Sequence, residues 1–164
     1  MIELKPFTEE DFDTLISWID SEETLVQFAG INFTFPLTHE QLTLNLESPK
    51  IKAYKVIHLP TTKTIGHGEI YINDANEAIL GKIIIDTNYR GKGFGQQIVD
   101  SLLEVSFEQL RVHKAMLYVF DWNIAAIKCY EKAGFVTDKG VTKRREANGK
   151  IWTAIKMSID KKQN

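Results

Sequence analysis

Apolar residues in the first third of the chain follow first a strand-like and then a helix-like spacing. Residues 2–5 alternate apolar and polar side chains, which predicts a short strand. Thr8 precedes three acidic residues, as is typical of a helix start, and apolar residues recur at helical spacing up to residue 19. A second helix is expected from Thr38 to Ser48. Between the two helices we expect a loop rich in aromatic residues: Phe28, Phe33 and Phe35.

The middle of the chain changes to a period of two residues. Strands are predicted over residues 53–59, 64–72 and 78–85, separated by two short segments of turn-forming residues, and they read as an antiparallel meander. A long helix is expected over residues 93–110. Its apolar stripe is wide, which indicates that the helix packs against a sheet.

The last third predicts a strand over residues 115–120, a helix over 123–133 and a terminal hairpin. The hairpin turns at Asn148-Gly149, a strong two-residue turn signal. The expected order is therefore β-α-α-β-β-β-α-β-α-β-β, a mixed α/β fold. The 164 residues contain no repeat and no linker, so we expect a single domain over residues 1–164.

Composition places the chain among globular proteins and removes several classes of site. A single cysteine, Cys129, cannot form an internal disulfide, and no paired Cys/His spacing offers a zinc site. We therefore expect no metal and a cytoplasmic location. The apolar runs are too short for a membrane span, and the first residues do not resemble a signal peptide.

Charge is distributed unevenly along the chain, although the net charge is only −2. Residues 1–50 sum to −8, residues 51–110 to −1 and residues 111–164 to +7. This polarity either serves solubility alone or gives the two ends partners of opposite charge. The basic third does not interleave aromatic and basic residues, which argues against a nucleic-acid partner.

The segment after the third strand of the meander carries the clearest chemistry. The apolar run Ile83, Ile84 and Ile85 is followed by a loop with three glycines and then by a helix. Converging backbone N–H groups and the positive end of the helix dipole would form a cradle for an anion, and we expect a phosphate or a pyrophosphate there. The cradle residues are Arg90, Gly91, Lys92, Gly93, Phe94, Gly95 and Gln96.

Two common phosphate loops fit this segment poorly. Gln96 stands where a dinucleotide-binding turn needs its third glycine, and Gly93 follows Lys92 where a Walker A loop needs Ser or Thr. A helix start that merely allows tight packing is the alternative, but it explains neither Arg90 nor Lys92.

Two motifs together resemble the GCN5-related N-acetyltransferase (GNAT) superfamily. The first is Arg90-x-x-Gly93-x-Gly95, and the second is Asn123-x-x-Ala126-x-x-x-Tyr130-x-x-x-Gly134-Phe135. The resemblance covers roughly residues 50–159 and is closest to the ribosomal-protein-alanine and spermidine acetyltransferase-like branches.

The resemblance implies a central, mostly antiparallel sheet of six to seven strands, flanked by about four helices and splayed between its fourth and fifth strands. Acetyl-CoA would lie in that opening, with its pantetheine arm paired to the backbone of Ile83–Ile85. Asn123, Ala126 and Tyr130 would share one face of a helix at the cofactor. Capping alone also accounts for Asn123 and Gly134, and Tyr130 could be an ordinary half-buried tyrosine.

The implied reaction is acetyl transfer to a primary amine by direct attack on the thioester. Tyr130 is the candidate acid for the departing thiolate, and Glu69 is the candidate base. Glu77 and Asp121 are alternative bases, and Glu69 could instead be a solvated carboxylate at a strand edge. The acceptor is a small-molecule or peptide amine. If residues 1–50 form its side of the cleft, it would be cationic and drawn by Asp20, Glu22 and Glu23.

Other functions are also compatible with these residues. The same fold could use another acyl-CoA, or it could be a non-catalytic module that binds CoA or a protein partner. A homodimer formed through the terminal hairpin is a further possibility.

Overall fold

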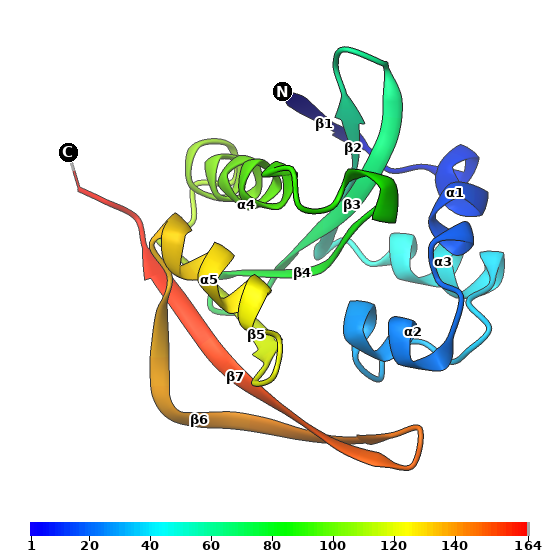
Figure 1. The fold of residues 1–164 in the computed structure, drawn as a ribbon. Helices are drawn as coiled ribbons and strands as arrows, with labels where there is room; N and C mark the ends of the chain where they lie inside the picture. The colour runs from blue at the N-terminus through cyan, green and yellow to red at the C-terminus, as the bar shows by residue number, and fades with distance from the viewer. Residues whose placement is uncertain (164) are drawn as a thin grey trace.

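A single seven-stranded sheet organises the chain, with helices on both of its faces (Figure 1). The computed structural model describes residues 1–163. Strand order in the sheet is β1-β2-β3-β4-β5-β7-β6. All neighbours are antiparallel except β4 and β5. The strands are β1 (Ile2–Pro6), β2 (Ile51–His58), β3 (Lys63–Ile72), β4 (Ala78–Ile85), β5 (Lys114–Phe120), β6 (Val136–Ala147) and β7 (Lys150–Asp160).

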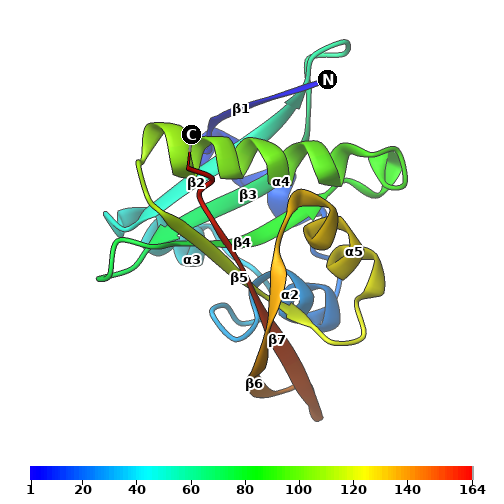
Figure 2. The same cartoon turned by 90° about the vertical axis from the view of Figure 1, so that its left-hand side faces the viewer.

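The helices divide between the two faces of the sheet (Figures 1 and 2). On one face α4 and α5 cover the main core, built around Ile98, Leu102 and Leu117. On the other face α1, α2 and α3 cover a second core that contains Phe12, Leu25 and Leu42. The helices are α1 (Phe12–Ser17), α2 (Glu22–Ala29), α3 (His39–Glu47), α4 (Phe94–Glu104) and α5 (Ile124–Ala133), with 3-10 turns at Glu9–Asp11 and Thr87–Tyr89.

The mixed α/β class and the splayed antiparallel sheet predicted from the sequence are confirmed, but one helix was missed. Phe28 does not lie in a loop: it is buried in α2, which begins at the N-cap Ser21. The described residues therefore contain five α-helices, one more than expected. The predicted helix over 93–110 is also interrupted, because α4 gives way to a π-helix over Val105–Gln109. The Ser106 hydroxyl there donates to the carbonyl of Leu102 at 2.8 Å.

The parallel pair β4 and β5 opens almost as soon as it forms. Only Ala78 with Ala115 and Ile79 with Met116 are in register. Beyond them the two strands diverge. An extra residue in β4 lies between the pairs Glu69–Gly81 and His67–Ile84, and Lys82 adopts a left-handed conformation with φ of +48°. Such a bulge bends a strand and strengthens its twist.

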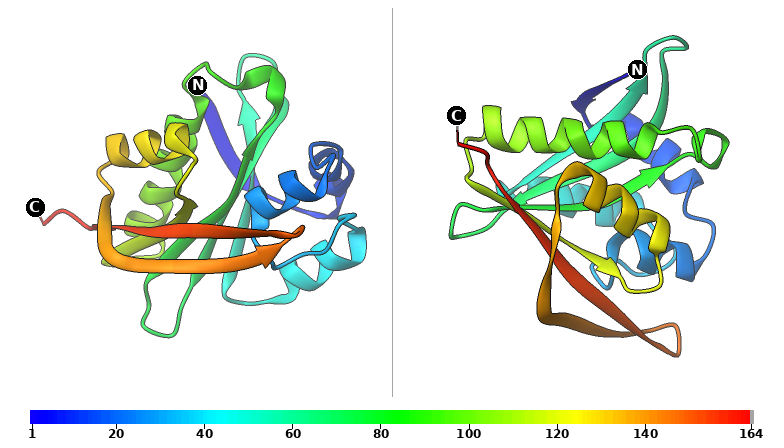
Figure 3. Two further views of the ribbon diagram at one scale, coloured as in Figure 1. Left: turned by 60° about the horizontal axis from the view of Figure 1, so that its bottom comes forward. Right: turned by 60° about the vertical axis from the view of Figure 1, so that its left-hand side comes forward.

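The terminal hairpin crosses beneath the helices α2 and α5 (Figure 3). Its turn is Asn148-Gly149, and both residues have positive φ, as the sequence signal predicts. The tip is tied to α2, because the ammonium of Lys150 lies 2.6 Å from the carboxylate of Glu23. Val26 of α2 also packs against the hairpin residue Trp152. The hairpin and α2 thus meet although they are far apart in the sequence.

Among residues 1–163, no helix is long and apolar enough to cross a membrane.

Gly134 offers a test of how α5 is joined to the sheet. It ends α5 with φ of +108°, and a Cβ there would lie 2.9 Å from Cδ1 of Ile159. Gly134→Ala should therefore lower the free energy of unfolding by about 2 kcal/mol, measured by urea denaturation. Gly140→Ala is the control, since Gly140 also has positive φ but open space around it. An equal loss in both variants would show that backbone strain alone, and not the contact with Ile159, is responsible.

Candidate active site

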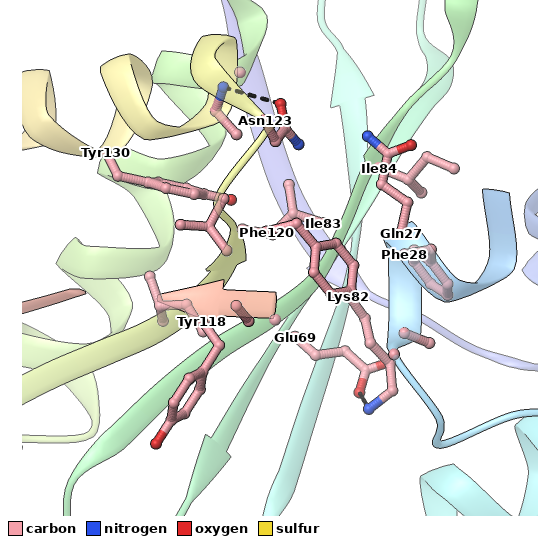
Figure 4. A pocket seen from close by; sticks show the side chains of 18 of the residues that line it. Gln27, Phe28, Glu69, Lys82, Ile83, Ile84, Tyr118, Phe120, Asn123 and Tyr130 are labelled. Atoms are coloured by element: carbon pink, nitrogen blue, oxygen red, sulfur yellow. Dashed lines mark hydrogen bonds and ion pairs between the residues drawn. The ribbon is translucent and has the colours of Figure 1, made fainter. Parts of the chain in front are cut away.

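A large cleft lies where β4 and β5 part, and its volume is about 1310 Å³. It passes through the splayed sheet, so that α4 and α5 line one end and α2 and α3 line the other (Figure 4). We call these the α4–α5 half and the α2–α3 half. The backbone and side chains of Ile79–Ile85 run between the two halves.

The predicted anion cradle lies in the α4–α5 half. Gly91 and Gly93 have φ of +73° and +85°, a conformation that favours glycine, and a Cβ at either position would meet nothing within 4 Å. Gly93 is the N-cap of α4, so the first N–H groups of that helix lack partners within it. Arg90 also lines the cleft, and its Nε donates to the carbonyl of Ile85 at 3.0 Å. This loop therefore combines open space, backbone N–H donors and the cation of Arg90, which are the features that bind a pyrophosphate.

Not every residue of the predicted cradle faces the cleft. Gly95 and Gln96 line it, whereas Lys92 and Phe94 do not. The Lys92 ammonium lies 5.5 Å from the ring centroid of Tyr89, and Phe94 packs edge-on against His58 with ring centroids 5.2 Å apart. Phe94 therefore helps to anchor the loop to the sheet, and a direct part for it in binding stays a prediction.

The second motif presents one face of α5 to the cleft, as its spacing predicts. Asn123, Ala126 and Tyr130 all line the cavity, and Figure 4 shows the Tyr130 hydroxyl pointing into it. The Asn123 side chain also accepts a hydrogen bond from the N–H of Ala126 at 3.3 Å, so it caps the helix as well. Both interpretations of this residue therefore hold at once.

The surroundings of Tyr130 keep its phenol protonated. Burial, with a smaller effect of the Cys129 thiol, raises the pKa of Tyr130 well above the usual value. Burial likewise raises the pKa of Cys129, a thiol that lines the same wall. The α4–α5 half therefore disfavours phenolate and thiolate alike.

The strand run Ile83–Ile85 has one free edge toward the cleft. Ile84 and Ile85 pair with His67 and Gly66 of β3, and these β4 residues are not paired with β5. Ile84 belongs to the core under α1–α3, and Ile83 and Ile85 pack against the core under α4 and α5. The run therefore fills both faces of the sheet while its backbone faces the opening.

Glu69 is buried, which contradicts the reading of a solvated carboxylate at a strand edge. Only 4% of it is exposed, at the floor of the α2–α3 half. Its carboxylate accepts hydrogen bonds from the Asn45 amide at 3.1 Å and contacts His67 Nε2 at 3.0 Å. The Lys82 ammonium lies 3.4 Å away. Burial alone would raise the pKa of Glu69, but His67, Lys82 and Asn45 outweigh it and lower that pKa.

The other two candidate bases lie outside the lining of the cleft. Glu77 is tied into its turn, where it exchanges hydrogen bonds with Asn73 at 2.8 and 3.1 Å. Asp121 is exposed beyond the end of β5. Of the three candidate bases, Glu69 alone therefore lines the cavity.

The acids expected to draw a cationic acceptor are also placed elsewhere. Asp20, Glu22 and Glu23 are exposed and do not line the cleft, and Glu23 is paired with Lys150. The cleft lining instead contains five cations that the sequence analysis did not name: Lys82, Lys128, Lys132, Lys143 and Arg145. Lys82 left a signal, because a charged residue interrupts an otherwise apolar strand.

Within residues 1–163, no group of three or more His, Cys, Asp and Glu side chains is arranged to hold a metal ion.

Comparison with known proteins identifies the family of the chain. Residues 22–135 match the sequence profile of the acetyltransferase (GNAT) family. The chain belongs to the GNAT family. The spermidine N(1)-acetyltransferase of Vibrio cholerae is 32% identical over 90 residues, a match that spans 55% of this chain and about half (52%) of that protein. An aminoglycoside N(6')-acetyltransferase of Klebsiella pneumoniae is 25% identical over 156 residues, covering 86% of this chain and 77% of that protein.

The fold of this GNAT protein also matches solved structures. The crystal structure of a Vibrio cholerae spermidine N-acetyltransferase with CoA and spermine superposes with a TM-score of 0.83 and 22% identity, covering 97% of this chain and 95% of that one. The family resemblance drawn from the two motifs is thus confirmed, together with the fold that it implies.

The buried Glu69 network predicts a pH-dependent contribution to stability. Because the folded pKa of Glu69 is lowered, the ionised carboxylate stabilises the protein above the unfolded pKa of about 4.3, and this stabilisation is lost as the pH falls through the folded value. Glu69→Gln should lower the free energy of unfolding by about 2 kcal/mol at pH 7, and this deficit should shrink progressively as the pH falls below about 4. Urea denaturation across this range measures both. The exposed Glu47→Gln is the control, and a pH-independent deficit in Glu69→Gln would contradict the argument.

Proposed function

We propose that the protein transfers the acetyl group of acetyl-CoA to a primary amine. The observation that carries the proposal is one continuous cleft in which the cradle, the free edge of β4 and the Tyr130 hydroxyl all meet. Acetyl-CoA, when bound, supplies an activated thioester. The chain must then hold the cofactor, remove a proton from the amine and return one to the thiolate.

The α4–α5 half suits the cofactor. Free N–H groups at the start of α4 and the side chain of Arg90 would hold the pyrophosphate. The backbone of Ile83–Ile85 would pair with the extended pantetheine arm, and one N–H of that strand would donate to the thioester oxygen. Lys128 and Lys132 on the same wall add positive charge for an anionic cofactor.

Tyr130 would donate the proton to the departing thiolate. A free thiol has a pKa of about 8.5, so a phenol with a raised pKa is a weak donor to a thiolate in water. Burial acts on both groups, however, as the raised pKa of Cys129 on the same wall illustrates. Burial in this half would raise the pKa of the CoA thiol as well, so the difference between the thiol pKa and the phenol pKa would stay small enough for proton transfer.

Glu69 would accept the proton of the attacking amine, directly or through a water molecule. Its lowered pKa keeps it ionised at neutral pH, so it is always available to accept a hydrogen bond from the amine. Because Lys82 already balances its charge and His67 and Asn45 contact its oxygens, its effect is to orient the amine and to relay the proton rather than to act as a strong base.

The test is a screen of amines with acetyl-CoA, in which thiol release and mass spectrometry report transfer. Relatives named for spermidine and aminoglycosides place polycationic amines in the panel, and amino acids and peptides complete it. Tight CoA binding without transfer to any amine would instead favour a binding module. A cytoplasmic location and a homodimer stay predictions.

Gly93→Asp tests the anion cradle. The substitution puts a carboxylate where a pyrophosphate is expected, so the acetyl-CoA Kd should rise by about tenfold or more, measured by calorimetry. Gly140→Asp is the matched control, because Gly140 also has positive φ and lies outside the lining of the cleft. An unchanged Kd in a folded Gly93→Asp protein would remove the cofactor from this loop.

Tyr130→Phe tests the acid. It preserves the packing but deletes the hydroxyl, so kcat should fall about 10²-fold while the acetyl-CoA Kd barely moves. Tyr54→Phe is the control, since Tyr54 lies on β2 outside the lining of the cleft. Wild-type turnover in Tyr130→Phe would leave this tyrosine a packing role only.

A further inference from the structure

We infer that the amine acceptor carries a carboxylate and an apolar side chain, as an aromatic or branched α-amino acid does. This inference rests on the proposed acetyl transfer and adds the chemistry of the acceptor. It follows from two properties of the α2–α3 half, the sign of its charge and the apolar character of its mouth.

The charge of the cleft is strongly positive. Among residues 1–163, Glu69 is the single carboxylate in the lining, against six cationic side chains. Three of these, Arg90, Lys128 and Lys132, lie in the α4–α5 half, where an anionic cofactor would use them. The remaining three are Lys82, Lys143 and Arg145.

The register of the hairpin places two of these cations on the α2–α3 side. Lys143 is paired with Ala154 and Arg145 with Trp152. Ala154 and Trp152 form a cluster with Val26 of α2, so this face of the hairpin looks toward α2. Lys143 and Arg145 therefore lie across the sheet from the half where the pyrophosphate would bind.

Neither hairpin cation has a carboxylate partner among the ion pairs of the described residues. The Lys143 ammonium lies 3.8 Å from the ring centroid of Tyr118, which also lines the cleft. Arg145 makes one long hydrogen bond of 3.5 Å, from Nη1 to the carbonyl of Arg144. A guanidinium has five N–H donors, so Arg145 keeps enough of them for a bidentate bond to a carboxylate.

The lone carboxylate offers little to a polycation. Glu69 already contacts Lys82 at 3.4 Å and His67 at 3.0 Å, and its two oxygens share the Asn45 amide. A second cationic group of an acceptor would face Lys82, Lys143 or Arg145 with no carboxylate left to balance it. An amine with its own carboxylate avoids this repulsion.

The mouth of the α2–α3 half is apolar. Several large hydrophobic side chains line it, and Leu44, Ile31 and Tyr71 are 61%, 58% and 37% exposed. Phe33 lies beside them, with the Lys82 ammonium 5.6 Å from its ring centroid. Exposed apolar side chains gathered at a cavity mark a binding surface, and an apolar acceptor side chain would cover them.

A pair of acceptors isolates the carboxylate. L-phenylalanine and phenethylamine share the ring and the primary amine and differ by the carboxylate alone. We expect kcat/KM for L-phenylalanine to exceed that for phenethylamine and for spermidine by about tenfold or more. Equal or better use of phenethylamine or spermidine overturns the inference and leaves the proposed acetyl transfer intact.

Variants on one strand then locate the carboxylate contact. Arg145→Gln should lower kcat/KM about tenfold for L-phenylalanine and less than about twofold for phenethylamine. Arg144→Gln is the matched control, because Arg144 immediately precedes Arg145 on β6, is exposed and does not line the cleft. Equal losses for both amines in Arg145→Gln would show a structural role and overturn the contact.

Binding provides a readout that does not depend on turnover. Calorimetry with the CoA-loaded protein should give a Kd for L-phenylalanine about tenfold below that for phenethylamine, and Arg145→Gln should remove the difference. If this binding preference holds but no amine is acetylated, the proposed function fails while the carboxylate site stands. If the two amines bind equally, the carboxylate site is refuted.

Discussion

The early separation of β4 from β5 is the constraint on which the rest of the molecule depends. Two residues of each strand are paired, and beyond them the backbone edge of β4 faces a cavity instead of a neighbouring strand. Unpaired backbone groups are costly unless water or a ligand satisfies them. The two strands stay apart because different helices pack on the two faces of the sheet: α4 and α5 on one face, and α2 and α3 on the other. The bulge at Lys82 lies at the point where β4 turns away.

The buried carboxylate in this opening is balanced by its immediate neighbours. Glu69 would be unstable as an isolated buried anion, and three neighbours make its ionised form the favoured one. Lys82, which balances the charge of Glu69, has a positive φ that few non-glycine residues adopt. The charge balance around Glu69 therefore depends on the bulge in β4. The cations of the hairpin lie outside this balance and face the α2–α3 half of the cleft.

Much of the architecture could be predicted from periodicity and turns, because strands β2 to β4, the helix after the glycine loop and the Asn148-Gly149 hairpin depend on local signals. Helix α2 was predicted as a loop because it has only eight residues, and so short a helix depends on tertiary burial, here of Leu25, Val26 and Phe28, more than on its own sequence. The N-cap Ser21 was the one local signal that could have indicated it. The face shared by Asn123, Ala126 and Tyr130 followed from helical spacing. The burial of Glu69 could not be predicted from spacing, because the carboxylate is bonded to Asn45 of α3, which is distant in the sequence.

Separate hydrophobic clusters support the two halves of the cleft, and this separation bears on how the protein can change. The cluster under α4 and α5 holds the glycine loop and Tyr130, whereas Val26, Phe120 and Trp152 join α2 to the hairpin in a cluster of their own. Residues on α2, α3 and β6 can therefore be exchanged without repacking the core that holds the glycine loop. A fold divided in this way allows evolution, or a protein engineer, to change the residues of the α2–α3 half while the α4–α5 half stays the same.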